Sequence, residues 1–391
     1  MESFSLDSKI YRTIQDVSQS EWDSINAADD VFHTHAFLED VEEAKVENSD
    51  FWYLMLYCDG KIVATAVLSA FVINLDLFVG AGAFIRLVRI VWPGFLKIKL
   101  LMCGVPASFG QKNILIAKPE HTKACLDLVS RTMEEIAEKA KIKYLAYKEF
   151  KEKEVVYFEH LLHKGYFRAF SLPYAKMEIK WKDFSTYLNA LRHGYRRQIL
   201  SSLNKLGLDA NFALNRDLEG MGLNVPKLIV TDSEVCTPEL FYSSYLEVMK
   251  RASSKLETLN LDFFRNYFKS HAQKLIFIVL QDESRMYGAA VLVPHQKELT
   301  FSLIGKYSDK DEYDTYFNLI AAIVKYAIEN EYTRINMGQT SYYPKLRAGA
   351  ITENEYIYFK SKNVWIHGLL KMGNKVVFPE TKLKNLKVFK E

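Results

Sequence analysis

A short segment of the chain, residues 334–350, combines residue types that could act on a carbonyl group. A predicted strand ends at Gly338 and is followed by Gln339, Tyr342 and Lys345. Glycine allows the backbone to bend sharply and to approach a ligand closely. A lysine a few residues away can neutralise a phosphate or carboxylate, and the glutamine can orient an acceptor. We therefore select these four residues as candidate catalytic residues; the alternative for Lys345 is a solvent-exposed loop lysine.

The chemistry that suits this segment is the transfer of an acyl group to an amine. Such a reaction needs a donor carbonyl held near the amine, a hydrogen-bond donor for its oxygen and a proton acceptor. The backbone N–H at Gly338 is a candidate for the second role. Four side chains have the right type for the third role, and the sequence does not choose between them. They are His33, His35, His193 and Tyr342.

A second group of interest lies on a predicted helix over residues 184–206, which ends at Gly207. Apolar residues follow one face of this helix, whereas Arg196 and Arg197 lie on another face together with His193. Consecutive cations on one helical turn can engage phosphate oxygens from two directions. The alternative is a solvated face or pairing with acidic residues. The candidate cofactor-binding residues are Arg192, Arg196, Arg197, Lys306 and Tyr316.

The elements that must position these residues occur twice along the chain. In the second half, hydrophobic periodicity predicts a hairpin, a third strand, a helix and a further strand. The first half has the same order, with a hairpin whose turn is Asp59-Gly60, a strong hairpin signal. The predicted elements are 51–58, 61–73, 113–117, 121–140 and 143–148 in the first half, and 275–281, 285–294, 298–304, 313–330 and 333–337 in the second.

This repeat predicts two domains of one kind. A chain of 391 residues is too long for one ordinary core. We expect domains at 1–180 and 181–391, each with a central mixed sheet flanked by helices, in the mixed α/β (α+β) class. The active site is expected in the second domain, where the strands near Ile304 and Met337 part.

Composition and motifs exclude several classes. The formal net charge of +3 does not by itself indicate a nucleic acid or an anionic membrane as partner. The four cysteines have no metal-ligand or redox spacing, and no zinc-protease, serine-hydrolase, phosphate-loop or calcium-loop motif occurs. We expect no metal. The N-terminus lacks a signal segment, and together with the cysteines this favours the cytoplasm.

Three segments resemble the GNAT superfamily, within it the two-domain branch that includes the Fem-type aminoacyl transferases of peptidoglycan synthesis. Residues 184–208, with their arginine-rich centre, are similar to the helix that opens the second domain of that branch. Asn336-Met-Gly-Gln339 with Lys345 and Gly349 resembles its strand end and following lysine and glycine. Residues 32–39 resemble its early segment, so the likeness covers roughly residues 20 to 365.

The resemblance implies tandem GNAT-like domains and N-acyl transfer from acyl-CoA or an acyl-carrier thioester to an amine of a small-molecule or cell-envelope substrate. The glycine-rich turn that holds the pyrophosphate of acyl-CoA in ordinary GNAT enzymes is missing at 305–312 and at 117–121. One alternative is therefore a Fem-type transferase that uses charged tRNA. Another is a non-catalytic binding module. The expected partners are a small-molecule amine and an acyl-carrier protein or charged tRNA.

Residues 84–102 are apolar with only basic charges and are interrupted by Pro93-Gly94. They are too broken to span a bilayer, but the piece before the proline could lie on a membrane surface or cover a long acyl chain. The alternative is an amphipathic lid helix followed by a buried strand.

Overall fold

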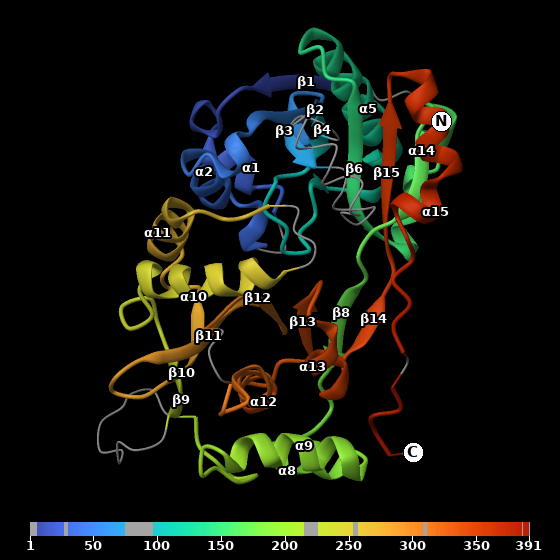
Figure 1. Cartoon of the computed structure of the whole chain (residues 1–391). Helices are drawn as coiled ribbons and strands as arrows, with labels where there is room; N and C mark the ends of the chain where they lie inside the picture. The colour runs from blue at the N-terminus through green and yellow to red at the C-terminus, as the bar shows by residue number, and fades with distance from the viewer. Residues whose placement is uncertain are drawn as a thin grey trace, which may run out of the picture. The chain divides into compact units, whose positions relative to one another are not determined.

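A computed structural model describes residues 6–26, 30–74, 97–214, 226–252, 257–307, 311–384 and 386–390 (Figure 1). The chain forms two compact units. The first unit contains residues 1–172, 254–259 and 354–381, and the second contains 173–253, 260–353 and 382–391.

The first unit is built on one mixed sheet. Its strands follow the order β1-β2-β3-β4-β6-β15-β7, with β5 paired to β3. All pairs are antiparallel except β4 with β6. The strands are β1 (Leu6–Tyr11), β2 (Asp50–Cys58), β3 (Lys61–Asn74), β4 (Lys97–Cys103), β5 (Ile114–Ile116), β6 (Tyr144–Lys151), β7 (Phe167–Phe170) and β15 (Glu355–Ser361).

Helices cover both faces of this sheet. On one face α5 (Thr122–Lys139) packs its apolar side, including Val129 and Met133, against β2, β3 and β6. On the other face Phe378 and the partly buried Leu370 pack against Phe359 of β15. The remaining helices of this unit are α1 (Gln19–Asp23), α2 (His35–Glu43), α6 (Val155–Phe158), α7 (His160–His163), α14 (Val364–Met372) and α15 (Asn374–Val377).

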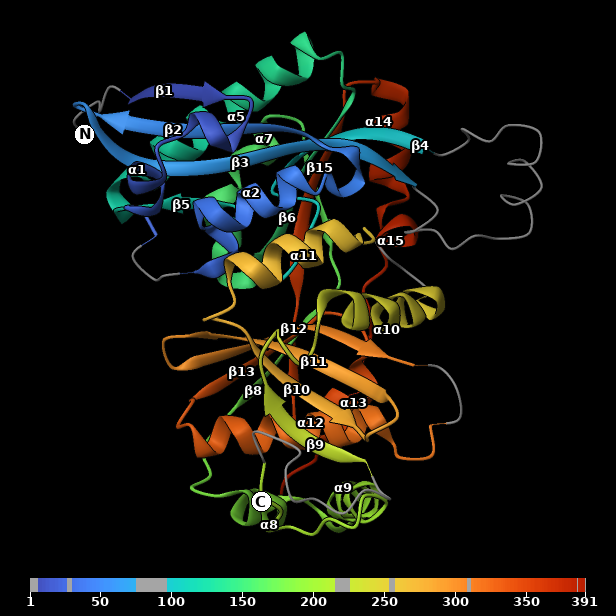
Figure 2. The same ribbon diagram turned by 90° about the vertical axis from the view of Figure 1, so that its left-hand side faces the viewer.

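The second unit repeats this architecture, with the strand order β14-β8-β13-β12-β11-β10-β9 and a parallel pair between β12 and β13. Figure 2 shows α12 on one face of the sheet and α10 and α11 on the other. The strands are β8 (Tyr174–Glu178), β9 (Lys227–Thr231), β10 (Ile276–Gln281), β11 (Met286–His295), β12 (Glu298–Lys306), β13 (Arg334–Gly338) and β14 (Ile351–Glu353), and the helices are α8 (Phe184–Ala190), α9 (His193–Asn204), α10 (Pro238–Arg251), α11 (Leu261–Ser270), α12 (Thr315–Glu329) and α13 (Tyr342–Arg347).

The two sheets exchange one strand each. Beside the parallel pair of the first sheet, β15 from the end of the chain pairs with β6 and β7. Beside the parallel pair of the second sheet, β8 from the middle of the chain pairs with β13 and β14. The predicted ranges 1–180 and 181–391 are consecutive, whereas the compact units interleave, because each sheet is completed by a strand from the other half of the chain.

The single helix predicted over 184–206 is wrong. The chain forms α8 and α9, and the residues between them, Leu191 and Arg192, are extended, with ψ of 144° and 149°. Leu191 forms an isolated antiparallel bridge with Phe389, and the N–H of Arg192 donates to the carbonyl of Val388 at 2.9 Å. The last residues of the chain therefore satisfy backbone groups that a continuous helix would have paired internally.

The predicted strands and helices of the repeat are confirmed, with ends that shift by one to three residues. The pairing of the repeat is corrected at one strand: 113–117 is β5, which lies off the main strand order, and the counterpart of β12 is β4. In the Asp59-Gly60 turn both residues have positive φ, 50° and 74°, as a tight two-residue hairpin requires. Of the segment 84–102, residues 84–96 lie outside the described residues. Residues 97–102 belong to β4, in which Leu100 and Leu101 are buried. Among the helices that the structure describes, none is long and apolar enough to cross a membrane.

Candidate active site

The candidate site lies where the parallel strands of the second sheet separate. Registered pairs join β12 and β13 at Glu298–Arg334, Leu299–Ile335 and Thr300–Asn336. Beyond these pairs β12 continues to Lys306 and β13 to Gly338. The two strands thus part at the place the sequence predicted, and backbone groups beyond Asn336 are released from that ladder.

The loop after β13 has an unusual backbone. Gly338, Thr340 and Ser341 have φ of 68°, 61° and 45°. This left-handed region is readily adopted by glycine but costs energy for threonine and serine. A Cβ atom added at Gly338 would lie 3.8 Å from the carbonyl oxygen of Phe301, so conformation rather than space selects glycine here. Strain of this kind persists only where neighbouring contacts hold it.

Lys345 supplies those contacts. It lies on α13, is 3% exposed, and donates from Nζ to the carbonyl of Gln339 at 3.1 Å and of Thr340 at 3.0 Å. Its Nζ also lies 5.7 Å from the ring centroid of Phe301. Burial lowers the pKa of Lys345 from 10.5 to about 7. The alternative of a solvent-exposed loop lysine is therefore wrong.

The protonation state of Lys345 bears directly on its chemistry. A neutral amine has two N–H bonds, the number that the carbonyls of Gln339 and Thr340 accept, and one lone pair that remains available. With a pKa of about 7, a large share of the molecules has this neutral form at neutral pH. Lys345 is thus suited to accept a proton, a role that sequence reasoning had given only to histidines and a tyrosine.

Two tyrosines border the same loop. Tyr316, in the first turn of α12, is hydrogen-bonded to Ser341, and burial raises its pKa well above the usual value. Tyr342 begins α13 and donates from its hydroxyl to the carbonyl of Pro173 at 2.7 Å. Tyr316, predicted as a cofactor-binding residue, therefore joins Gly338, Gln339 and Lys345 at the strand end. The hydroxyl of Tyr342 is used to fix α13.

The predicted anion site on α9 is linked to α13 by Arg347. Its Nε donates to the side-chain oxygen of Gln198, and its guanidinium lies 4.9 Å from the ring centroid of Tyr195. On α9, Arg197 is exposed and Arg196 half-buried. Arg192 instead donates from Nε to the carbonyl of Phe389 at 3.1 Å. Arg196 and Arg197 remain candidates for an anion, whereas Arg192 anchors the end of the chain.

Carboxylates occupy the N-terminus of α12, the position at which a pyrophosphate binds in ordinary GNAT enzymes. The carboxylate of Asp311 accepts from the N–H of Thr315 at 2.9 Å and lies 3.0 Å from Nζ of Lys306. Burial opposes ionisation of Asp311, but these hydrogen bonds leave its pKa lower than usual. Asp314 lies 2.9 Å from Nζ of Lys205. Lys306 is thus already paired with a carboxylate, and the described part of this helix terminus carries two carboxylates.

The histidines considered as bases have other surroundings. His33 is buried, its ring nitrogens lie 3.0 Å from the carbonyl of Lys112 and 2.9 Å from the hydroxyl of Thr65, and burial lowers its pKa to about 4. His35 is buried, with Nε2 2.8 Å from the carbonyl of Ile14. Both histidines therefore fix the packing of the first unit. His193 is exposed at the start of α9.

The equivalent strand end of the first unit is filled by charged side chains. The β4–β6 ladder ends at Cys103–Tyr147, and Glu149, two residues on, has a positive φ of 62°, comparable to the 68° of Gly338 in the second unit. Its carboxylate accepts from the hydroxyl of Ser108 at 2.6 Å and lies 3.7 Å from Nζ of Lys148. The N–H of Ser108 donates to Glu257 at 3.2 Å. This position is closed by side chains, so the second unit carries the better candidate site.

The fold and this strand end define a class: the protein has a tandem GNAT-like fold, with two mixed sheets that each part at one parallel pair. A family model described as FemAB-like, peptidoglycan biosynthesis/recognition, matches residues 13–343. The chain belongs to that family.

Solved structures support the fold. The structure of FemX shares 10% sequence identity and a TM-score of 0.56, with 93% of this chain and 100% of that chain covered. A tandem GNAT protein from the clavulanic acid biosynthesis pathway shares 8% identity and a TM-score of 0.50, with 92% and 99% covered. At these identities the likeness concerns the fold alone. No protein of curated function matches the sequence significantly.

Proposed function

We propose that the protein transfers an aminoacyl group from an activated ester to an amine of a peptidoglycan precursor. Family membership and fold support an acyltransferase-type function. The observation that carries the finer proposal is Lys345, a buried lysine with a pKa of about 7 at the parting strands.

Each residue has a role in the proposed reaction. The acceptor nitrogen attacks the donor carbonyl carbon, a C–N bond forms, and the C–O bond of the ester breaks. The nitrogen loses its proton to the neutral Nζ of Lys345, and that proton then passes to the leaving oxygen. A backbone N–H released near Gly338 stabilises the negative charge on the carbonyl oxygen. The chemistry needs no covalent intermediate between the substrate and the protein.

The donor is proposed from charge. Asp311 and Asp314 at the start of α12 disfavour the pyrophosphate of acyl-CoA at this helix. Arg196 and Arg197 offer cations on α9 instead, next to the residues that contact Arg347 of α13. A charged tRNA has phosphates that these arginines could bind and an ester that activates the aminoacyl group. It is therefore preferred to an acyl-CoA or acyl-carrier thioester.

A transfer assay with two donors tests this proposal. The purified protein is incubated with a peptidoglycan precursor that carries a free amine, and with either aminoacyl-tRNA or acyl-CoA. We expect transfer of a radiolabelled amino acid from the tRNA, abolished by ribonuclease and strongly reduced by Lys345→Met. Transfer from acyl-CoA alone would replace the proposed donor. Transfer from neither donor, with no binding of either, would favour the alternative of a binding module.

A further inference from the structure

Helix α14 of the first unit has two apolar faces. One face packs inward: the His367 ring lies 5.5 Å from that of Phe167, and Leu370 packs against the cluster that contains Phe359 and Phe378. This face holds the helix against the sheet through partly buried side chains. The apolar residues of the opposite face therefore need another explanation.

The opposite face is a continuous exposed stripe. Its side chains recur at helical spacing over α14 and α15 and are exposed to an extent that is rare for large apolar residues. The stripe consists of Val364 (81% exposed), Trp365 (85%), Leu369 (67%), Met372 (80%) and Val376 (69%).

The charged residues within this segment of the chain are all basic, although Nζ of Lys362 lies 4.0 Å from the carboxylate of Glu134. Residues 362–377 contain Lys362, Lys371 and Lys375, all exposed, and no aspartate or glutamate. At a membrane surface such lysines extend their charged ends toward headgroups while the apolar side chains enter the interface. An apolar face with a tryptophan and flanking lysines is typical of helices that lie in the plane of an anionic membrane surface.

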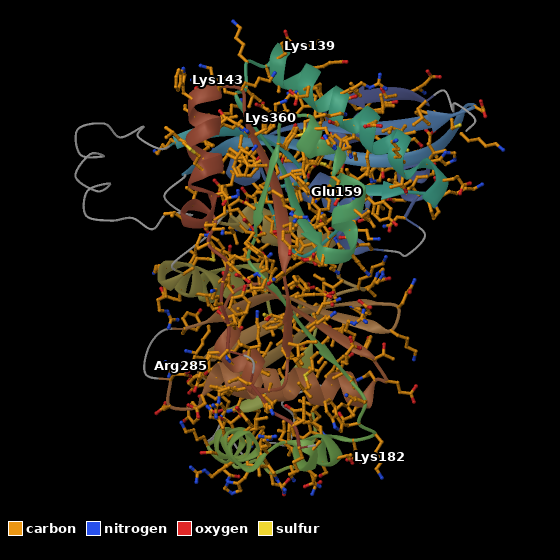
Figure 3. All side chains as sticks on the ribbon, turned by 90° about the vertical axis from the view of Figure 1, so that its right-hand side faces the viewer. Lys139, Lys143, Glu159, Lys182, Arg285 and Lys360 are labelled. Carbon is orange, nitrogen blue, oxygen red and sulfur yellow. The ribbon has the colours of Figure 1, made fainter. Side chains whose placement is uncertain are left out.

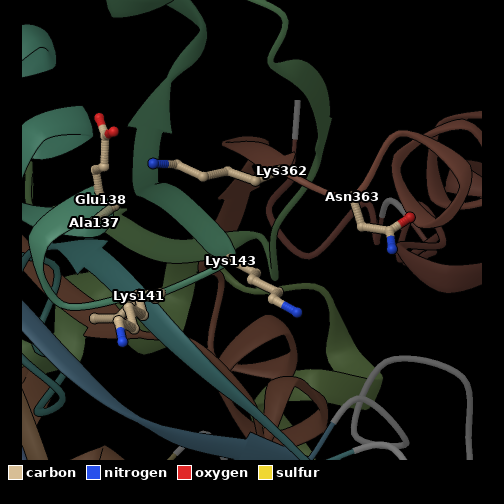
Figure 4. Close-up of a pocket in the computed structure, with 7 residues that line it drawn as sticks. Ala137, Glu138, Lys141, Lys143, Lys362 and Asn363 are labelled. Atoms are coloured by element: carbon tan, nitrogen blue, oxygen red, sulfur yellow. The ribbon is translucent and has the colours of Figure 1, made fainter.

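A pocket adjoins the N-terminal end of the helix and carries further basic charge (Figure 4). It is lined by Lys141, Lys143 and Lys362 with Asn363, and by one acidic residue, Glu138. The N–H of Lys362 donates to the carbonyl of Lys143 at 2.7 Å, which fixes this edge beside α14. In Figure 3, Lys143 lies beside the upper end of α14. The positive charge thus continues from the stripe into this pocket.

We propose that α14 docks the protein onto a membrane surface that contains anionic phospholipids, with the stripe in the interface and the lysines at the headgroups. Charge complementarity selects this occupant over a second copy of the chain, because two such faces would bring lysines together. The surface differs from the segment 84–102 predicted from sequence. It is independent of the proposed reaction, since none of its residues belongs to the strand end of the second unit.

Vesicle co-sedimentation of the full chain tests the docking. We expect binding to vesicles that contain phosphatidylglycerol, weaker binding to pure phosphatidylcholine, and weakening as salt is raised. The triple variant Trp365→Ala, Leu369→Ala, Met372→Ala should lower the partition coefficient by roughly tenfold or more. The double variant Lys371→Glu, Lys375→Glu should lower the partition coefficient on anionic vesicles only.

A matched control uses Val156→Ser with Tyr157→Ser, which removes similarly exposed apolar side chains from α6. This control should bind vesicles as the unaltered protein does. All variants should retain transfer to a soluble acceptor, so that failure of docking is separable from failure of the proposed function. The proposal is overturned if the unaltered protein ignores anionic vesicles, or if the triple variant binds them equally well. It is also overturned if the stripe instead mediates self-association that the triple variant abolishes.

Discussion

At the scale of single residues, the environment of Lys345 determines its chemistry. Two carbonyls fix its Nζ, and burial removes the water that would stabilise the ammonium form. The carbonyls belong to a loop whose φ values at Thr340 and Ser341 are costly. The lysine therefore both holds the loop and depends on it for its orientation.

Substitution of Lys345 separates proton transfer from simple charge. Lys345→Arg keeps a cation that does not lose its proton at physiological pH. If the neutral amine is the acting form, Lys345→Arg and Lys345→Met should both lower kcat by about 10²- to 10⁴-fold, a typical range for loss of a general base. Single-turnover transfer assays check this. Near-normal rates for the arginine variant alone would show that charge, and not proton acceptance, is what Lys345 supplies.

The pH dependence follows from the same group. Below pH 7 Lys345 is protonated, so we expect the rate of the chemical step to rise through an apparent pKa of about 7. The same shift affects stability: between about pH 7 and 10.5 the unfolded chain binds the proton and the folded chain does not, so this residue's contribution to stability rises with pH across that window. If the rate of Lys345→Met still rises through an apparent pKa near 7, the titrating group is not Lys345.

The sequence identified Lys345 and Gly338 from their types and spacing, but not the burial of the lysine. Burial depends on Phe301 and on α13, which local pattern does not reveal. The sequence also did not distinguish Arg196 and Arg197 from Arg192. That difference arises from a contact with Phe389, nearly two hundred residues away.

At the scale of elements, hydrophobic periodicity predicted the repeated strands and helices, because each has one clear apolar face. It failed between α8 and α9, where the apolar spacing continues through Leu191 although the backbone does not. The break is caused by residues 388–390, which pair with it from the end of the chain. Tertiary pairing has overridden local helical preference here.

Phe389 should accordingly support both helices. Its ring lies 5.0 Å from Trp181 and 6.4 Å from Tyr187, measured between centroids, and it fills the space beside Gly349, where a Cβ would come within 2.3 Å of it. We expect Phe389→Ala to destabilise the second unit by about 2 kcal/mol. Denaturant unfolding and faster amide exchange in α8 and α9 would report this.

The exposed Tyr157 of the first unit offers a comparison of similar size. Tyr157→Ala should change the free energy of unfolding by no more than about 0.5 kcal/mol. It should leave amide exchange in α8 and α9 as it is in the unaltered protein. Equal effects of the two substitutions would mean that the end of the chain contributes little to this fold.

At the scale of the whole molecule, the exchange of β8 and β15 makes the two units depend on each other for complete sheets. Removing residues 354–391 leaves β6 and β7 without the strand that joins them. The sequence predicted two similar units but not this exchange, because a strand's pattern shows that it is buried and not which sheet buries it.

Fragments test this dependence. Residues 1–180 alone should be insoluble or lack a cooperative unfolding transition, since two ladders of the sheet are missing. Residues 1–172 joined by a flexible glycine and serine linker to 354–381 should recover a cooperative transition. Circular dichroism melts of both fragments provide the measurement, and a well-folded 1–180 would contradict the need for β15.

The late position of β15 also has a cost during synthesis. A ribosome that has just completed β7 must add about 190 further residues before Ser361 emerges, which takes roughly 10 to 40 seconds at ordinary elongation rates. Throughout that interval the nascent chain carries two open strand edges beside apolar side chains. We therefore expect cells that make this protein to rely on ribosome-associated chaperones, which would cover these edges on the nascent N-terminal half.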